Sequence, residues 1–346
     1  MTVPALPPGT ISAGRHRRDR RLRAALAVLL VLVLGLFALT LTLGRTFTPP
    51  AAVVRVLLGE AVPGADFLVG TLRLPRAVMS MLAGLCFGLG GVTFQVMLRN
   101  PLASPDIIGI TSGASAAAVF AIIVLSLDGP AVSILAVVAG LGVALLVYAL
   151  AARNGVAGTR LILVGIGVSA MLDSVVAYIL ASAPAWNLQE AMRWLTGSVN
   201  GAQLGQAPPL LLALLVFGGL LLFHRRDLEM LRLGDDAAAA LGVRVARTRI
   251  AAIVAAVGMI ASATAVTGPI AFVSFLSGPI AARLVGGSGS LLLPSALVGA
   301  LLALGGDYVG QFLLPSRYPV GVVTGALGAP YLLVLIVRIN RTGRSL

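Results

Sequence analysis

The chain is 346 residues long, with 58% hydrophobic and only 11% charged residues, whereas a soluble domain averages about 45–50% apolar and about 25% charged residues. These proportions exclude an ordinary soluble enzyme or binding domain and predict that most of the chain is surrounded by lipid. The net charge of +13 comes from Arg without any Lys, and because the Arg residues stand between apolar stretches, the pattern indicates membrane topology and not a nucleic-acid-binding face.

The N-terminal region combines a basic segment with a long apolar stretch. Residues 1–23 begin with a Pro/Gly-rich lead and then carry six Arg, and residues 24–43 form an apolar run. A secretory signal peptide has the same order of charge and apolarity, but its apolar core is only about 7–15 residues long. We therefore expect residues 1–23 to be a basic cytoplasmic segment and residues 24–43 to be a retained first membrane span.

Nine further apolar stretches follow, each about as long as a membrane-spanning helix. They cover residues 76–98, 107–127, 130–151, 159–182, 208–224, 247–267, 270–285, 291–313 and 322–338. Small residues let helices approach closely in lipid, and Gly84, Gly88 and Gly91 fit that role in the second span. We predict an all-α integral membrane protein of about ten transmembrane helices, with one ten-helix domain over residues 24–341.

The Arg residues predict how the spans are oriented. If residues 1–23 are cytoplasmic and the spans number ten, 19 of the 25 Arg fall in cytoplasmic segments and six fall outside. Basic residues of short loops concentrate on the cytoplasmic side of membranes. We therefore expect a multi-pass protein of the plasma membrane with both termini in the cytoplasm.

The sequence lacks the residues that ATPases and many membrane enzymes need. A P-loop requires a Lys after its glycines, and the chain has none, so any ATP hydrolysis must occur in another polypeptide. Zinc-protease and serine-hydrolase motifs are also missing, and Cys86, His16 and His224 have no partners at metal-site spacing. We therefore expect no catalytic residues, no cofactor and no metal site.

Two acidic residues, Asp173 and Asp307, fall inside predicted spans. An ionisable group at membrane depth is costly and is therefore a candidate for a functional site. The alternative is that each acid lies near a helix end, where it reaches water or a neighbouring helix. The sequence leaves the role of both residues open.

Two polar segments flank the second span. The segment Leu72-Arg73-Leu74-Pro75-Arg76 precedes it on the predicted outer side, where two Arg run against the usual charge distribution. They either snorkel to the interface or act as docking charges for an acidic partner. The segment from Arg99 to Asp106 follows the span with two Pro residues, which predicts a tight turn and an irregular start to the next helix.

The longest polar stretch on the predicted cytoplasmic side covers residues 224–249. Within it, Asp235 and Asp236 are followed by four Ala and then by Leu241-Gly242. This order predicts a short helix with acids at its N-terminus and Gly at its C-terminus. A short rigid helix below a membrane domain suits contact with a partner protein, and an ordinary loop is the alternative.

These segments together resemble the FecCD family of iron-chelate and cobalamin importer permeases. The resemblance rests on R-L-P-R before the second span, R-N-P-L-A-S-P-D-I-I-G-I after it and D-x-A-x-x-L-G-V in the cytoplasmic loop. It continues with W-x-x-G-S at residues 194–198, G-P-I-A-F-V at 268–273 and Y-P-V-G-V-V-T-G at 318–325. The ending P-V-G-V-V-T-G-A-L-G-A-P-Y-L-L is most similar to the ferric-catecholate branch, which includes the ferric enterobactin permeases.

The chain departs from the family pattern at two places. Gly278-Pro279 stands where many members of that branch carry Pro followed by His or Gln, and Arg317 stands where the family often has Glu. Both positions bear on which ligand is carried. The resemblance otherwise runs in order from about residue 24 to residue 341.

The resemblance implies the cobalamin-permease-like fold of a type II ABC importer. In that arrangement two permease subunits, identical or homologous, each contribute ten helices and enclose one central path. ATP-binding cassette ATPase subunits bind on the cytoplasmic side, and an extracytoplasmic substrate-binding protein binds on the other. The cargo would be a ferric siderophore, whose iron stays inside its chelator.

The resemblance also implies roles for individual residues. Docking of the binding protein falls to Arg73 and Arg76, to which we add Arg317 although it departs from the family pattern, and coupling to the ATPase falls to Asp235, Asp236, Ala239, Leu241 and Gly242. The inner gate and path wall would include Asn154, Gly155, Gly158, Thr159, Gly165 and Ser169. The outer gate would include Trp194, Gly197 and Ser198.

The resulting expectation is the permease subunit of an ABC importer for ferric siderophores. Cobalamin and haem are alternative cargoes. A secondary transporter driven by an ion gradient is the runner-up, since inverted repeats are common there too, but the sequence lacks the chain of intramembrane acids and histidines that is typical of proton relays. A structural or signalling membrane protein is the third class.

Overall fold

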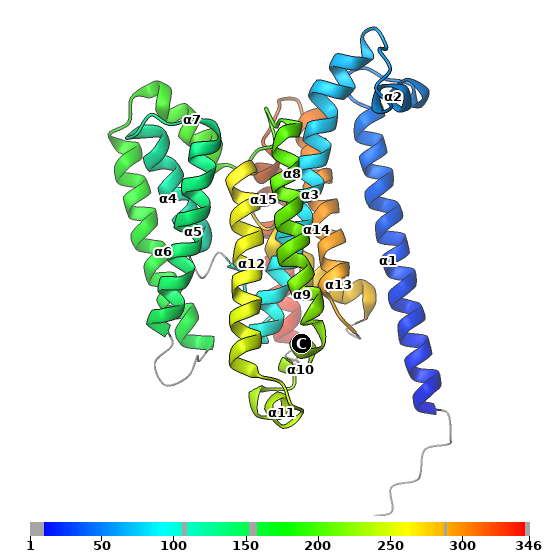
Figure 1. Cartoon of the computed structure of the whole chain (residues 1–346), viewed down its shortest axis with the longest axis vertical. Coiled ribbons are helices and arrows are strands. Elements are labelled where there is room, and N and C mark those ends of the chain that lie inside the picture. Colours follow the sequence, from blue (N-terminus) through cyan, green and yellow to red (C-terminus); the bar gives the residue numbers. More distant parts are fainter. Residues whose placement is uncertain (1–9, 106–108, 152–157, 287–288, 343–346) are drawn as a thin grey trace, which may run out of the picture.

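The computed structural model describes residues 10–105, 109–151, 158–286 and 289–342, and within these ranges every regular element is helical (Figure 1). Eight of the described helices are long and apolar enough to cross a membrane, and two shorter apolar helices, Ile110–Ile123 and Val273–Val285, complete a set of ten. These ten match the ten predicted spans in order, so the prediction of an all-α membrane protein is confirmed.

Short helical elements precede or follow some of the spans along the chain. The spans are α1 (Thr10–Thr42), α3 (Leu74–Leu98), α4 (Ile110–Ile123), α5 (Gly129–Ala151), α6 (Gly158–Ala181), the joined α8 (Ala207–Ala213), η4 (Leu214–Gly218) and α9 (Gly219–Phe223), then α12 (Val245–Thr267), α13 (Val273–Val285), α14 (Leu292–Tyr308) and α15 (Val320–Thr342). The short elements are α2 (Pro50–Leu57), η1 (Asp66–Arg73), α7 (Ala185–Leu195), η3 (Leu204–Gln206), α10 (Arg225–Leu231), α11 (Asp235–Ala240) and η5 (Val309–Leu313). Of the elements labelled η, η1, η4 and η5 are π-helical and η3 is a 3-10 helix. Helices α2 and α7 lie at one end of the bundle, hereafter the α7 end, and α10 and α11 lie at the opposite, α11 end (Figure 1).

Two spans are shorter as helices than the sequence suggested. α4 begins at Ile110 because Gly109 has a left-handed conformation, with φ of 78°. α13 begins at Val273 because Phe272 is also left-handed, with φ of 63°. A left-handed residue cannot continue a right-handed helix. The irregular start predicted after the Arg99–Asp106 segment is therefore found at Gly109.

α3 is the central helix of the bundle and packs against α12, α13 and α14. Of the most apolar stretch in Asp66–Leu98, 83% is buried. A Cβ added to Gly84 or Gly88 would collide with the backbone of α14, and one added to Gly91 would collide with the backbone of α13. Such close approach between helix backbones needs small residues, so the packing role predicted for these three glycines is confirmed.

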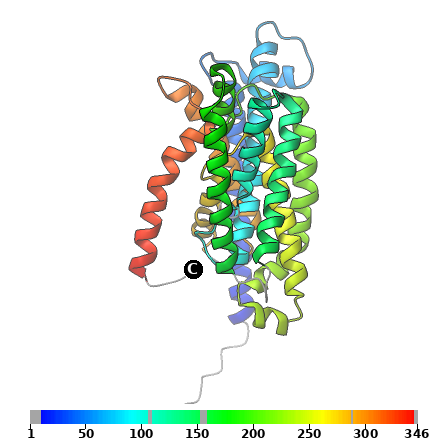
Figure 2. The same cartoon turned by 90° about the vertical axis from the view of Figure 1, so that its left-hand side faces the viewer.

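Helices α4, α5, α6 and α7 form a second group on one side of the bundle, and α5 joins this group to α12 (Figure 1). α6 is lightly packed, with 22% of its most apolar stretch buried. Figure 2 shows α15, in red, leaning away from the other helices toward its C-terminal end. Helix faces that stay uncovered in one chain of a membrane protein contact lipid, water or another subunit.

Helix α13 contains Pro279, which has no N–H to donate to the carbonyl of Phe275 four residues earlier. Gln95 of α3 supplies the missing donor, because its Nε2 lies 2.9 Å from that carbonyl oxygen. Gly278 makes room for this contact, since a Cβ there would overlap the Gln95 side chain. Gln95 of the same chain therefore supplies the donor that Pro279 lacks, in the space that Gly278 leaves free.

Candidate functional site

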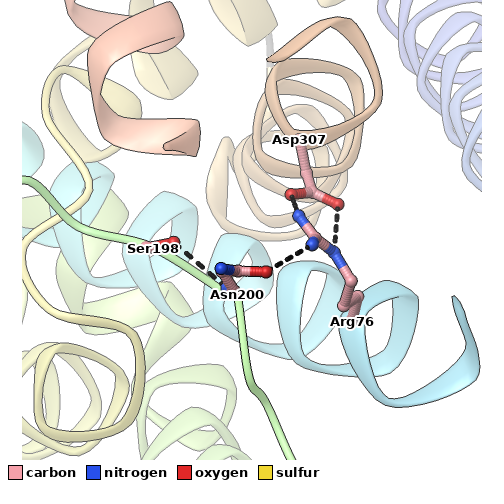
Figure 3. Close-up of polar contacts among 4 residues, drawn as sticks. All are labelled: Arg76, Ser198, Asn200 and Asp307. Atoms are coloured by element: carbon pink, nitrogen blue, oxygen red, sulfur yellow. Dashed lines mark hydrogen bonds and ion pairs between the residues drawn. The ribbon is translucent and has the colours of Figure 1, made fainter. Parts of the chain in front are cut away.

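An ion pair joins the start of α3 to α14 at the α7 end of the bundle (Figure 3). Arg76 Nη2 lies 2.5 Å from Asp307 Oδ1, and Arg76 Nε lies 3.4 Å from Asp307 Oδ2. The two side chains are 16% and 4% exposed, and burial strengthens the attraction by excluding water. The negative charge of Asp307, one of the two acids inside predicted spans, is therefore compensated by Arg76 of the same chain.

The same Arg76 side chain reaches the segment that follows α7. Its Nη1 donates to Asn200 Oδ1 at 3.0 Å, and the N–H of Asn200 donates to Ser198 Oγ at 3.1 Å (Figure 3). The N–H of Ser198 in turn donates to the Thr267 carbonyl at the end of α12, at 2.7 Å. Asn200 therefore connects the predicted outer gate to the α3–α14 ion pair.

The predicted gate residues Trp194, Gly197 and Ser198 lie together where α7 meets α12 and α15. The carbonyl of Gly197 accepts from the N–H of Gly321 at the start of α15, at 3.0 Å. Gly197 has φ of 69°, and a Cβ on it would collide with the carbonyl of Pro269. A side chain is therefore excluded at position 197 both by conformation and by space. The structure brings the three residues together, and their gating role remains a prediction.

Arg73 has a different environment from Arg76, although both belong to the R-L-P-R motif. Only 6% of Arg73 is exposed. Its Nη1 donates to the carbonyl of Leu41 at 2.9 Å, and its Nη2 donates to the carbonyl of Thr46 at 2.6 Å. The last carbonyls of a helix lack partners within the helix and attract cations. Arg73 therefore fastens the end of α1 to the start of α3, with little of it left at the outer surface.

A cavity of about 310 Å³ opens at this end of the bundle, and four Arg line it: Arg45, Arg73, Arg76 and Arg317. Arg45 and Arg317 are exposed. Among the described residues, neither takes part in an ion pair. Guanidinium groups bind carboxylates through charge-assisted, often bidentate hydrogen bonds. We call these four residues and the hollow between them the arginine cavity; its chemistry suits an acidic ligand.

Two of the predicted path residues lie on the packed face of α6. Gly165 is buried, and Ser169 is half-buried. A Cβ added to Gly109, at the start of α4, would approach Ser169 Oγ to 3.1 Å and the Gly165 carbonyl to 3.8 Å. Gly165 and Ser169 therefore face α4 within this chain.

The predicted inner-gate residues lie at and before the start of α6. Gly158 and Thr159 belong to its first turn. Asn154 and Gly155 lie outside the described residues. The segment's role at the inner gate remains a prediction.

At the α11 end, α10 and α11 form a helical hairpin below α9 and α12 (Figure 1). Asp235, in the first turn of α11, accepts a hydrogen bond at 2.9 Å from Arg249 of α12. Ala238 faces inward and is fully buried, whereas Ala239 and Leu241 are exposed, Leu241 to 59%. The hairpin is therefore fixed to α12 on one side and presents small and apolar side chains on the other.

The short helix predicted inside residues 224–249 begins and ends as the sequence indicated. Asp235 and Asp236 occupy the first turn of α11. The chain leaves the helix through Gly242, which has φ of 90°. Among the described residues other than its two chain neighbours, none has an atom within 4 Å of the position that a Cβ on Gly242 would occupy. The predicted short helix, with acids in its first turn and Gly after its end, is confirmed. Its coupling role remains a prediction.

The sequence does not mark the partners that hold these sites in place. Asn200 and Thr46 belong to no motif, and Arg249 is one of many Arg in its loop. Asp307 could have been matched with Arg76, because the predicted topology puts both residues near the outer ends of their spans. Among the described residues, no group of three or more His, Cys, Asp or Glu side chains is placed to hold a metal ion.

The chain is similar to known transport proteins over nearly its whole length. A model of the FecCD transport family matches residues 29–338. A ferric enterobactin transport system permease of Escherichia coli is 38% identical over 302 residues, which are 86% of this chain and 91% of that protein. An achromobactin transport system permease of Dickeya dadantii is 38% identical over 331 residues, which are 94% of this chain and 95% of that protein. A solved structure of a metal-chelate type ABC transporter in an inward-facing conformation has a TM-score of 0.79 at 27% identity, and the match covers 91% of this chain and 99% of that chain.

Proposed function

The chain belongs to the FecCD transport family, and we propose that it carries ferric siderophores across the plasma membrane. It is the permease subunit of an ABC importer and not itself an enzyme, since ATP hydrolysis belongs to a partner ATPase. The observation that carries the proposal is the ten-helix fold, shared over 91% of the chain with a metal-chelate type ABC transporter. The relatives' names give the cargo class: ferric enterobactin for one and achromobactin for another.

The α11 end faces the cytoplasm, and both termini lie on that side. Arg residues are more numerous at the α11 end, where the start of α1, α10, α12 and the connecting segments carry twelve, against six at the α7 end. The twelve are Arg17, Arg18, Arg20, Arg21, Arg23, Arg99, Arg225, Arg226, Arg232, Arg244, Arg247 and Arg249. Such an excess of basic residues is typical of cytoplasmic loops. The arginine cavity then faces outward, where the positive-inside rule does not explain its charges.

The outward arginine cavity receives acidic side chains of the substrate-binding protein. Arg317 and Arg45 meet the partner first, because they are exposed and unpaired among the described residues. Arg76 contributes from deeper in the cavity while it holds Asp307. Arg73 contributes mainly by fixing the outer end of α1. Complementary charges of this kind fix the register of two proteins and speed their encounter.

The α10–α11 hairpin couples the permease to the ATPase. Ala239 and Leu241 form the contact surface, Asp235 and Asp236 start the helix, and Gly242 ends it. The ion pair between Asp235 and Arg249 connects any movement of α11 to α12. Helix α12 ends at Thr267, which binds the predicted outer gate. One rigid span therefore joins the coupling surface to the gate.

A second permease subunit, identical or homologous, completes the path. The lightly packed α6 supports this part of the proposal, because its uncovered face carries the small residues Gly167, Ala170 and Ser174 among large apolar side chains. Small residues let the helices of two subunits approach closely. Gly158 and Thr159 at the start of α6 would line the inner gate, together with Asn154 and Gly155 ahead of it. Gly165 and Ser169 would set the spacing between α6 and α4.

Uptake by a strain that lacks this gene tests the proposed function. We expect complementation to restore the uptake of at least one radio-iron chelate from a panel of catecholate, hydroxamate and carboxylate siderophores. Cobalamin and haem are assayed in parallel, since both are alternative cargoes. Restored uptake of cobalamin or haem, with no iron chelate carried, would overturn the assignment of cargo.

A further inference from the structure

Asp173 is the second acid at membrane depth, and its surroundings differ from those of Asp307. It lies on α6, and its side chain is exposed. Among the described residues, it takes part in no ion pair and no hydrogen bond. Asp307, by contrast, is buried against Arg76.

The depth of Asp173 follows from the length of its helix. α6 contains 24 residues from Gly158 to Ala181, which span about 36 Å at about 1.5 Å per residue. Asp173 lies eight residues before Ala181, or about 12 Å from that end of the helix. Since the hydrocarbon core is about 30 Å thick, Asp173 lies inside the core and not at its edge.

An unpaired carboxylate at this depth cannot face lipid, because charged side chains in spans point toward a partner or toward a water-filled space. The neighbours of Asp173 on the same face are Ala170 and Ala177, which are small and also exposed. Ser174 beside it bonds to the Ala170 carbonyl at 2.8 Å and does not cover the carboxylate. The small side chains next to Asp173 therefore leave its carboxylate uncovered, whereas Ile166, two turns earlier on the same face, is large, apolar and exposed. The uncovered carboxylate, and not the face as a whole, indicates contact with a water-filled space.

We propose that Asp173 lines the translocation path and makes it selective for chelates whose net charge is zero or positive. The inference rests on the proposed function and adds a charge rule to it. A fixed carboxylate lowers the energy of a cation in the path and raises that of an anion, and the low-dielectric walls strengthen both effects. Each permease subunit that carries this residue adds one such charge.

The charge rule separates two chemical classes of siderophore. In a ferric complex of three catecholates, the phenolate charges outweigh the charge of Fe³⁺, so the complex is strongly anionic. In a ferric complex of three hydroxamates, the ligand charges and the metal charge cancel. A protonated amine in the chelator then makes the complex cationic. The carboxylate of Asp173 favours the hydroxamate class over the catecholate class, so faster uptake of a ferric catecholate, the cargo in the name of the Escherichia coli relative, than of a cationic trihydroxamate would contradict the charge rule.

Three trihydroxamate chelators separate the effect of net charge on uptake from the effect of iron coordination. The chelators share one iron-binding shell and differ at a terminal amine, which is free, acetylated or succinylated, so that the ferric complexes are cationic, neutral or anionic. Initial uptake is compared between the wild-type importer and Asp173→Asn for each chelate separately. Selection by the binding protein cancels in this comparison, because only the permease differs.

For Asp173→Asn we expect about tenfold slower uptake of the cationic chelate, about twofold change or less for the neutral one and faster uptake of the anionic one. Asp173→Glu should keep the wild-type order, and Ser182→Ala, just beyond the end of α6, serves as a control with wild-type rates. The same factor for all three chelates would overturn the inference and assign Asp173 to subunit packing. A wild-type importer that carries no iron chelate at all would instead refute the proposed function.

Water access to position 173 provides a second measurement that does not depend on cargo. The only cysteine of the sequence, Cys86, is buried, so Asp173→Cys introduces a single reactive thiol. During ATP turnover, a membrane-impermeant maleimide should label Asp173→Cys and leave Val31→Cys, on the exposed face of α1, unlabelled. Equal resistance of both variants would show that no aqueous path reaches Asp173.

Discussion

Arg76 and Asp307 lie 231 positions apart in the sequence and form a buried ion pair between α3 and α14. The same guanidinium group binds Asn200, two residues after the predicted gate residue Ser198. Arg76 therefore connects the arginine cavity, which it lines, to the predicted outer gate. A carboxylate that enters the cavity competes with Asp307 for the same donor groups.

Removal of Asp307 alone should destabilise the chain more than removal of the whole pair. Asp307→Ala leaves the Arg76 charge partly buried without its partner, a loss of about 3–5 kcal/mol. The double variant Arg76→Met, Asp307→Leu replaces the pair by apolar packing and should lose less. Unfolding in detergent, followed by circular dichroism, measures both, and a double variant that loses as much stability as Asp307→Ala or more would argue against the pair.

Arg317 and Arg73 should respond to mutation in different assays. Arg317→Glu reverses an exposed charge and should weaken binding-protein association at least about tenfold, with stability within about 0.5 kcal/mol of wild type. An acid-to-Arg exchange on the binding protein should restore part of the affinity. Undiminished affinity of Arg317→Glu at low salt would remove this residue from the docking surface.

Arg73→Gln should instead reduce stability, by about 1–3 kcal/mol, because the carbonyls of Leu41 and Thr46 lose their charged donor. The folded fraction should still bind the binding protein. If Arg73→Gln keeps wild-type stability but loses docking, the arginine is a contact residue, as the sequence motif alone suggests.

The helices could be predicted because each span is a long apolar stretch, and the bilayer imposes that length directly. The side-chain partners could not, because they depend on which helices become neighbours. Arg73 and Arg76 look equivalent in R-L-P-R, yet η1 ends at Arg73 and α3 begins at Leu74. The change from the π-helix η1 to the α-helix α3 alters the direction of successive side chains. The guanidinium of Arg73 therefore turns to α1, and that of Arg76 turns to α14.

Helix α11 was predictable for a different reason, since its start and stop signals are local. Asp235, Asp236 and Gly242 define it in the sequence and in the structure. The exposure of its faces was not predictable, because four consecutive Ala give no hydrophobic period. Only the fold distinguishes buried Ala238 from exposed Ala239.

Gln95 should be needed for the stability of α13. Gln95→Leu removes the only side chain that the described contacts place on the Phe275 carbonyl, and a buried carbonyl without a donor costs about 1–3 kcal/mol. Gln189→Leu, at an exposed position of α7, should change stability by less than about 0.5 kcal/mol. Equal unfolding curves for the two variants would show that another donor satisfies Phe275.

Ala239→Trp should prevent ATPase binding without disturbing the permease fold. Ala239 is exposed, so the isolated chain has room for a large side chain, and only a partner surface would exclude it. Gly242→Trp is a weaker test, because φ of 90° strains any residue other than Gly. At equal permease levels, ATPase co-purification should be lost for Ala239→Trp and retained for Ala185→Trp at the other end of the molecule. Full retention by Ala239→Trp would reduce the loop to a linker.

The source of energy for uptake tests the central claim most directly. The chain is reconstituted into liposomes with its ATPase and any second permease subunit, ATP is enclosed, and binding protein loaded with a radio-iron chelate is added outside. We predict uptake that requires both ATP and the binding protein, falls to background with Ala239→Trp and persists when ionophores abolish all ion gradients. Uptake that continues without the ATPase and stops with the ionophores would contradict the account and identify a secondary transporter.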